Sequence, residues 1–361
     1  MEYSNLIDKF KIQGNKITFF DKYGEGHINE TYLLIMDDTY QYILQKINNH
    51  IFLDVDLLMW NIEKVTSFLS NKINQSGGDS TRETLNIVYT KDNKSFYHDI
   101  DTDSYYRIYL FVKDSVTLQK CSSAELFAYS AIGFANFAKQ LEDFDASTLG
   151  EVIQNFHNTK KRFEHFKNTL ARDPLNRAKD VKEEIDFILK REKDCSIIVD
   201  ALEKHLIPLH VTHNDTKLNN VLFDKKTMKP LCVIDLDTVM PGSILYDFGD
   251  SIRYGCNPAG EAERDLSKVV FNLDYFKAYV DAYLSTLGDS ISQKEKELLP
   301  FSGKLMTLEC GIRFLDDYLD GDHYFRISKS DDNLARARTQ FKLVMDMESL
   351  MDEMNLYVGN K

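Results

Sequence analysis

The chain has 361 residues, of which 43% are hydrophobic and 28% charged, a composition typical of globular proteins large enough for two lobes. With 44 basic and 57 acidic residues, its formal charge of −13 disfavours nucleic acids and anionic membrane surfaces as partners. No apolar run approaches about 18 residues, so no membrane-spanning helix is predicted. Residues 1–10 lack the pattern of a secretory signal, and five scattered cysteines form no disulfide or zinc spacing, so we expect a reducing, cytoplasmic location.

Residues 1–112 predict an antiparallel sheet with one helix packed on it. The helix follows Asp54, which can cap it, because apolar residues recur at helical spacing from Val55 to Leu69. Segments with strand alternation, rich in aromatic and β-branched residues, precede and follow this helix. The strand candidates are residues 16–23, 31–36, 40–47, 84–90 and 104–112.

The rest of the chain is predicted to be mainly helical. Residues 122–142, 151–206 and 262 onwards have helical character with few Gly or Pro. Strand character returns only at residues 205–213, 219–224 and 229–237. The pattern therefore predicts an α+β chain whose two parts meet between residues 112 and 121.

A polar loop between two apolar segments holds the most informative motif. Residues 213–220 contain His213, Asp215, Lys217 and Asn220 in the spacing H-x-D-x-K-x-x-N, with the Asp-to-Asn offset of kinase catalytic loops. Asp215 can orient an attacking hydroxyl, and Lys217 can offset γ-phosphate charge. The amide oxygen of Asn220 suits Mg²⁺, which prefers oxygen ligands. We expect His213 to hold the loop backbone.

A second carboxylate follows at the end of a predicted strand. Asp235 is the expected second Mg²⁺ ligand, with Asp237 close enough to assist. The tripeptide that begins at Asp247 spells the protein-kinase metal motif, but it lies farther from Asp215 along the chain than Asp235 does. It also follows Met240-Pro-Gly-Ser, which does not read as a strand. We expect Asp247 to brace the catalytic loop.

The catalytic interpretation has a plain alternative. Short Asp- and Asn-containing strings occur by chance in turns, where they only shape the backbone. The apolar flanks, Lys217 and the correctly placed Asp235 together favour catalysis.

At these residues the chain resembles the aminoglycoside phosphotransferase and choline kinase superfamily, and within it the N-acetylhexosamine 1-kinases. The resemblance implies a bilobal protein-kinase-like fold, with residues 1–112 as a small antiparallel-sheet, nucleotide-binding lobe and residues 113–361 as a mostly helical lobe with the catalytic loop and acceptor site. It also implies ATP, Mg²⁺ and phosphorylation of the anomeric hydroxyl of N-acetylglucosamine or N-acetylgalactosamine. The matching tracts are residues 24–34, 42–48, 212–224, 233–255 and 309–325.

Four residues are predicted on the nucleotide side. Gly24 and Gly26 form a glycine loop that is short of G-x-G-x-x-G. The third strand should carry a basic residue for the phosphates, and Lys46 is the candidate, with Glu63 as its partner. Since Gln45 and Lys46 point to opposite faces, the pattern leaves open which of the two meets the nucleotide. A solvated lysine and an unrelated surface glutamate are the alternative.

The acceptor site is predicted at Arg313 and Tyr324, with His27 and Asn29 of the glycine loop within reach. The resemblance favours the first two, and a guanidinium beside aromatic rings suits a sugar. Alternatively, Glu309, Arg313 and Asp317 form a salt-bridged surface stripe, because they recur every four residues.

Three other functions compete with this one. A kinase of the same fold acting on an amino alcohol or aminoglycoside would need acidic residues in the cleft, and a group near the acceptor candidates could supply them. A binding module without catalysis predicts loss of Asp215, Asn220 or Asp235, and all three are present. A protein kinase is disfavoured because no A-P-E motif follows Asp235. The acidic group consists of Asp316, Asp317, Asp320 and Asp322.

Overall fold

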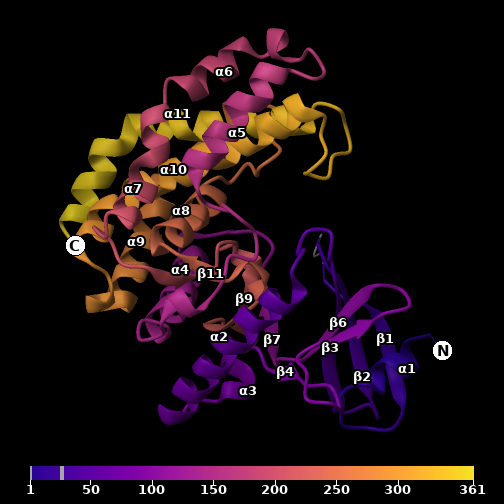
Figure 1. The fold of residues 1–361 in the computed structure, drawn as a ribbon. Helices are drawn as coiled ribbons and strands as arrows, with labels where there is room; N and C mark the ends of the chain where they lie inside the picture. Colours follow the sequence, from indigo (N-terminus) through magenta and orange to yellow (C-terminus); the bar gives the residue numbers. More distant parts are fainter. Residues whose placement is uncertain (1, 25–27) are drawn as a thin grey trace. The chain divides into compact units, whose positions relative to one another are not determined.

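The computed structural model describes residues 2–24 and 28–361 (Figure 1). The chain divides into two compact units. The first unit holds Met1–Val116, Ser147–Ile153 and Leu222–Met240, and the second holds Thr117–Ala146, Gln154–Val221 and Pro241–Lys361. Two segments from later in the chain thus belong to the first unit. A division of the chain at a single residue does not describe these two units.

The first unit is built on an antiparallel sheet in the order β1-β2-β3-β6-β4, with β5 paired to β6. The apolar side chains of one sheet face, among them Leu34, Leu44 and Ile108, are fully buried in a core closed by the short helix α1. The five predicted strand segments are confirmed, whereas α1, α3 and β5 were not predicted. The elements are α1 (Glu2–Ile7), β1 (Ile17–Lys22), β2 (Glu30–Met36), β3 (Tyr40–Ile47), α3 (Ser80–Glu83), β4 (Ile87–Val88), β5 (Tyr97–Asp99) and β6 (Ser104–Leu110).

The predicted capped helix is α2 (Val55–Gln75). Asp54 caps it, since its carboxylate accepts a hydrogen bond of 2.8 Å from the backbone N–H of Leu57. The buried Asn61 then donates to the carbonyls of Gly150, at 2.8 Å, and Val239, at 2.9 Å. The Asn61 amide is thus one of the contacts that hold residues 147–153 and 222–240 in the first unit.

A small three-stranded sheet carries the metal-site candidate. Its order is β10-β9-β7, formed by β10 (Pro230–Val233), β9 (Val221–Asp224) and β7 (Ser115–Thr117). Soon after β10 the chain bends, because Asp235 adopts the left-handed conformation with φ 61° and ψ 57°. The next residues form the 3₁₀ turn η5 (Leu236–Thr238).

The second unit is helical, as predicted, and within it α10 and α11 pack along each other (Figure 1). Two short strands, β8 (His210–Thr212) and β11 (Met240–Gly242), pair beside the helices. No helix in the described part of the chain is long and apolar enough to cross a membrane. The helices are α4 (Ala124–Gln140), α5 (Thr159–Arg172), α6 (Lys182–Leu189), α7 (Ile197–Glu203), α8 (Ile244–Gly255), α9 (Leu273–Leu287), α10 (Gln293–Asp320) and α11 (Asp332–Gly359).

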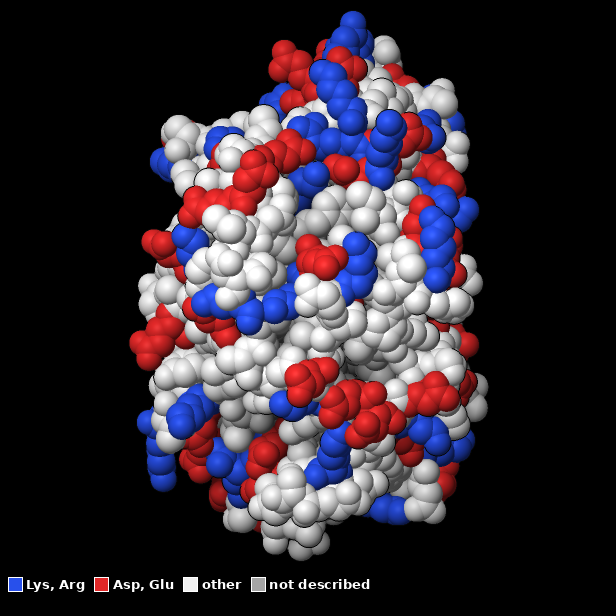
Figure 2. Space-filling model, turned by 90° about the vertical axis from the view of Figure 1, so that its left-hand side faces the viewer, with Lys and Arg blue, Asp and Glu red and all other residues white. Residues whose placement is uncertain are grey.

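Charged side chains of both signs are interspersed on the face shown in Figure 2, where no continuous basic surface is visible. This agrees with the acidic composition of the chain, which gives no electrostatic reason to expect a polyanion on that face.

Helix α8 accounts for the tripeptide that imitates a kinase metal motif. Phe248 is fully buried in the largest core of the second unit. Gly249 lies so close to α10 that an added Cβ would be 2.5 Å from the carbonyl oxygen of Ser302. The expectation that no strand precedes the tripeptide was wrong, because β11 does. Its spacing from Asp215 and the contacts of Asp247 still argue against a metal-binding role.

Candidate active site

The loop after β8 is held from inside by His213. Its ring is fully buried, and the rings of Phe134 and Phe137 meet it edge-on with centroids at 5.5 and 6.1 Å. The Nδ1 atom accepts a hydrogen bond of 3.2 Å from the backbone N–H of Asp215. The prediction that His213 holds the loop backbone is confirmed.

The carboxylate of Asp247 braces the same loop from α8. Its two oxygens accept hydrogen bonds from the backbone N–H groups of His213, at 2.9 Å, and Asn214, at 2.7 Å. Asn214 has φ 66°, so these bonds fix a backbone conformation that most residues avoid. Burial raises the pKa of Asp247, although both amide bonds favour the charged form. The predicted bracing role of Asp247 is confirmed.

Asp215, Lys217 and Asn220 lie together on this loop, where the first two are half-buried and Asn220 is buried. The Lys217 Nζ is 2.7 Å from Asp215 Oδ1, and the amide nitrogen of Asn220 donates to Asp215 Oδ2 at 3.1 Å and to its backbone carbonyl at 2.8 Å. Burial opposes the charge of Asp215, but Lys217 outweighs burial, so the pKa of that carboxyl lies below its ordinary value. The pKa of Lys217 is raised, above all by Asp215. At neutral pH the pair is therefore charged on both sides.

The donor atoms of the two metal-ligand candidates suit a hard cation. The amide nitrogen of Asn220 is engaged by Asp215, which leaves its amide oxygen for a ligand. Asp235, in the first unit, contributes a carboxylate. Within residues 2–24 and 28–361 no group of three or more His, Cys, Asp or Glu side chains could hold a metal by itself. Mg²⁺ is usually held by one or two protein oxygens together with substrate phosphates.

Asp237 is occupied by protein donors. It is 4% exposed, and its Oδ1 lies 2.6 Å from the guanidinium of the fully buried Arg107. Its Oδ2 accepts a hydrogen bond of 2.5 Å from the amide of Asn29. The other end of that amide accepts from the backbone N–H of Asn48 at 2.9 Å. Asn29 is thus engaged at both ends, and its role in substrate binding stays a prediction.

The remaining nucleotide-side candidates are only partly placed. Gly24 has φ 79°, which a glycine adopts without strain, whereas Gly26 and His27 lie outside the described residues. Alternation along β3 puts Lys46 on the sheet face of the core residue Leu44, while Gln45 lies on the other face.

The predicted partnership of Lys46 with Glu63 is not present. In the part of the chain that the structure describes, Glu63 instead accepts a hydrogen bond of 2.9 Å from the hydroxyl of Tyr89. A phosphate-binding role for Lys46 and for Glu63 stays a prediction.

The acceptor candidates lie together in the second unit. The guanidinium of the half-buried Arg313 faces the rings of Phe156, Tyr324 and Phe325 at 5.1, 5.6 and 5.5 Å, and it lies 3.4 Å from the Tyr324 hydroxyl. The buried Asp317 places the rings of Tyr324 and Phe325, because it accepts hydrogen bonds from the backbone N–H groups of residues 323–325.

The alternative of a salt-bridged surface stripe is wrong. Glu309 is 1% exposed and Asp317 is 7% exposed, so neither lies on the surface. The Glu309 carboxylate binds Thr159 at 2.5 Å and Nδ1 of His157 at 2.7 Å. Nε2 of His157 meets the carbonyl of Asn214 at 3.1 Å. Segment 155–159, which has no role in the sequence-based prediction, thus links α10 to the catalytic loop.

Sequence reasoning missed Arg162 on α5. Its guanidinium is close enough to Arg313 that repulsion, after burial, lowers the pKa of Arg162. Among the described residues, neither arginine forms an ion pair within 4 Å, even though the chain is strongly acidic. The signal in the sequence was weak, because Arg162 lies in the basic run Lys160-Lys161-Arg162, which reads as a solvated face.

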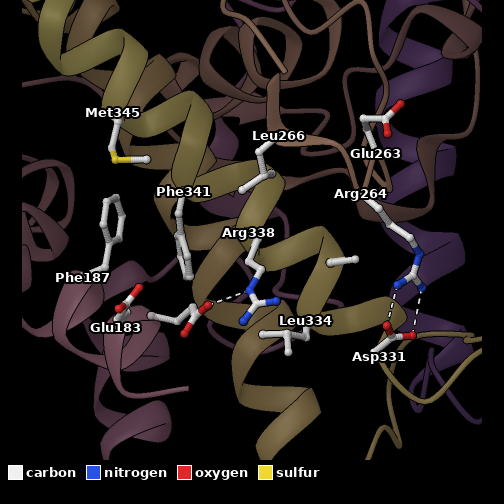
Figure 3. A pocket seen from close by; sticks show the side chains of 12 residues that line it. Glu183, Phe187, Glu263, Arg264, Leu266, Asp331, Leu334, Arg338, Phe341 and Met345 are labelled. Carbon is white, nitrogen blue, oxygen red and sulfur yellow. Dashed lines mark hydrogen bonds and ion pairs between the residues drawn. The ribbon is translucent and has the colours of Figure 1, made fainter. Parts of the chain in front are cut away.

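A separate pocket of about 600 Å³ lies between α6, the turn η6 (Leu266–Lys268) and α11 (Figure 3). Its two arginines are already neutralised, Arg264 by Asp331 at 2.5 Å and Arg338 by Glu184 at 2.6 Å. Because it is lined by none of the predicted site residues, we assign it no part in catalysis.

Comparison with known proteins agrees with this site. Residues 131–279 match the model of the phosphotransferase enzyme family. A microcompartment-associated aminopropanol kinase aligns over 98% of both chains with a TM-score of 0.60 and 14% identity. A spectinomycin phosphotransferase, solved with ADP and spectinomycin, aligns over 98% of both chains with a TM-score of 0.59 and 12% identity.

Choline kinase from Cryptosporidium parvum Iowa II aligns over 97% of this chain and 94% of its own, with a TM-score of 0.57 and 16% identity. At such identities the three structures establish the fold. The family match supports the resemblance to the superfamily over residues 131–279.

Proposed function

We propose that the protein is an ATP- and Mg²⁺-dependent kinase that phosphorylates a hydroxyl group of a small sugar. The observation that carries this is the charged Asp215 carboxylate, held between Lys217 and Asn220 on a loop that Asp247 braces. A fixed carboxylate of this kind is what orients the attacking hydroxyl in kinase active sites. Such an enzyme would use cytoplasmic ATP, in keeping with the location expected from the sequence.

In the proposed step the acceptor oxygen forms a bond to the γ-phosphorus, while the bond to the β–γ bridging oxygen breaks and ADP takes the electron pair. Asp215 accepts the hydrogen bond of the attacking hydroxyl and then its proton. Lys217 offsets the charge on the transferred group. Mg²⁺, when bound through Asn220 and Asp235, would neutralise charge that develops on the phosphates.

The charges around the acceptor candidates favour an uncharged, hydroxyl-rich acceptor over a cationic one. The guanidiniums of Arg162 and Arg313, which have no ion-pair partner among the described residues, would repel an ammonium group. The four aspartates that could have bound a cation each contact a partner within the protein, although Oδ1 of Asp316 is buried without a hydrogen bond. Their partners are His165 for Asp316, backbone N–H groups and Asn333 for Asp317, Arg172 for Asp320, and Arg177 for Asp322.

Within that class, the proposed acceptor is the anomeric hydroxyl of an N-acetylhexosamine. The support is the resemblance of residues 212–224 and 309–325 to the N-acetylhexosamine 1-kinases. Arg313 would donate to sugar hydroxyls or to the acetamide oxygen. Tyr324, which is 57% exposed, offers an aromatic face for the sugar ring.

The second candidate is a kinase for an amino alcohol or aminoglycoside, favoured by the aminopropanol kinase and spectinomycin phosphotransferase among the similar structures. The test is ATP consumption with N-acetylglucosamine, N-acetylgalactosamine, aminopropanol, choline and spectinomycin at equal concentrations. Phosphorus NMR of the product then locates the phosphate. Turnover of an amine in place of both sugars, or a phosphate on the 6-hydroxyl, would contradict the sugar 1-kinase proposal.

A further inference from the structure

The first unit contains a buried polar network centred on Arg107 of β6. Its guanidinium is 1% exposed, lies 2.6 Å from Asp237 Oδ1, and donates from Nε to Gln45 Oε1 at 2.9 Å. Gln45 is the direct cross-strand neighbour of Arg107 and donates in turn to the Thr31 hydroxyl at 3.0 Å. The network therefore spans β2, β3 and β6 on one face of the sheet.

The same network reaches the end of the glycine loop. Asn29 donates to Asp237 Oδ2 at 2.5 Å and accepts from the backbone N–H of Asn48, which follows β3. Asp237 thus joins the strand that carries Arg107 to the segment that leads into β2. Loss of the Asp237 carboxylate would remove both the ion-pair partner of the buried Arg107 and the acceptor of the Asn29 amide.

A buried ion pair is a costly way to stabilise a fold, because apolar side chains of similar size usually serve as well. In some proteins such a pair fixes one arrangement of the chain. Here that arrangement includes Asp235, which shortly precedes Asp237 and has the strained left-handed conformation with φ 61°. Arg107 also interacts electrostatically with Asp235. The pair is therefore placed to hold the backbone of a metal-ligand candidate.

We propose that Arg107 and Asp237 form a positioning pair that holds Asp235 in place for the Mg²⁺–nucleotide complex. The buried basic side chain of this site is then Arg107 of β6 and not Lys46 of β3. Lys46 lies on the opposite face of β3 from Gln45 and hence from this network. This inference rests on the proposed function, since it takes Asp235 as a ligand of the nucleotide-bound cation.

The test is calorimetric titration of a non-hydrolysable ATP analogue, with and without Mg²⁺ and without any acceptor. The main variant is Arg107→Met with Asp237→Leu, which removes the pair without leaving a buried charge. The Mg²⁺-dependent gain in affinity should fall at least tenfold, while affinity without Mg²⁺ stays within twofold. Arg82→Met with Asp224→Asn, which breaks a half-exposed ion pair of 3.0 Å in the same unit, is the matched control and should retain the full gain.

An unchanged Mg²⁺-dependent gain in the folded double variant would overturn the inference. If that variant does not fold, Gln45→Met removes the hydrogen bonds of Gln45 to Arg107 and to the Thr31 hydroxyl and should reduce the Mg²⁺-dependent gain about threefold. An unchanged gain in Gln45→Met would likewise overturn the inference. If the wild-type protein itself shows no Mg²⁺-dependent binding of the analogue, the proposed function fails first, and that result is distinct from either outcome in the variants.

Discussion

The brace between Asp247 and the catalytic loop can be tested with the near-isosteric change Asp247→Asn. The carboxylate accepts two backbone hydrogen bonds, at 2.9 and 2.7 Å, on two different oxygens. An asparagine can accept only one of them, and its NH₂ group would face the other backbone N–H. A hydrogen bond to a charged group contributes about 1.5–3 kcal/mol, and an unsatisfied buried donor costs about 1–3 kcal/mol.

Part of this loss is regained because Asp247 is buried and carries a raised pKa, so removing its charge relieves a desolvation cost. We therefore expect the unfolding free energy to fall by about 2–3 kcal/mol, measured by urea denaturation. With Asp215 no longer fixed, kcat should fall by roughly tenfold to a hundredfold, since small misplacements of catalytic groups have effects of that order.

The Mg²⁺ concentration that gives half-maximal activity should stay unchanged in Asp247→Asn, because the residue braces a backbone and binds no metal. The matched control is Asp274→Asn in the first turn of α9, which lies outside the site. A variant with normal stability and a strongly raised Mg²⁺ requirement would refute this reasoning. It would mean that the tripeptide at Asp247 is the metal motif after all.

Further predictions concern the site itself. Asp215→Asn should lower kcat at least about 100-fold with nucleotide affinity nearly unchanged, as single-turnover assays and calorimetry can check. Asp235→Ala should abolish Mg²⁺-dependent ATP turnover in an ADP-release assay. Arg313→Ala and Arg162→Ala should each lower kcat/KM for the sugar by about tenfold to a hundredfold and leave the KM for ATP unchanged. In the folded protein the pKa of Glu309 is lowered despite burial, mainly by His157. The charged Glu309 carboxylate therefore contributes its full stabilisation of the fold above the ordinary glutamate pKa. This contribution is lost as the pH falls through the lowered pKa. The stability gap between wild type and Glu309→Gln should thus narrow as the pH falls below the ordinary glutamate pKa, measured by denaturation at each pH.

Local patterns predicted the elements that depend on neighbouring residues. The strands β1 to β3 and the capped helix α2 follow from alternation and from Asp54, which are visible within a few residues. The very short strand β5 depends on pairing with β6, so the chain around it carries little signal. For the same reason, nothing near residue 150 indicates that Asn61 will hold that segment.

The catalytic loop was predictable because its chemistry and its supports lie close together in sequence. His213 and Asp215 belong to one motif, and the brace at Asp247 follows in α8, the next α-helix along the chain. The Arg107–Asp237 pair could not be predicted in this way, since its members lie far apart in the sequence and Arg107 belongs to no motif. A buried arginine in a strand reads as an ordinary exposed residue until the three-dimensional partner is known.

Charge in the acceptor region shows why counting residues is a poor guide to what a site binds. Four aspartates between positions 316 and 322 suggested a site for a cationic acceptor. The carboxylates of Asp317, Asp320 and Asp322 are bound by protein donors, whereas Asp316 meets His165 through one oxygen only. Asp317 alone accepts three backbone N–H bonds that place Tyr324 beside Arg313. The acidic residues thus shape the aromatic turn, while the arginines that lack an ion-pair partner in the described chain set the charge that an acceptor meets. In an acidic protein, an arginine without an ion-pair partner is a rarer feature than an aspartate. This feature of the acceptor region argues for a neutral, hydroxyl-rich substrate.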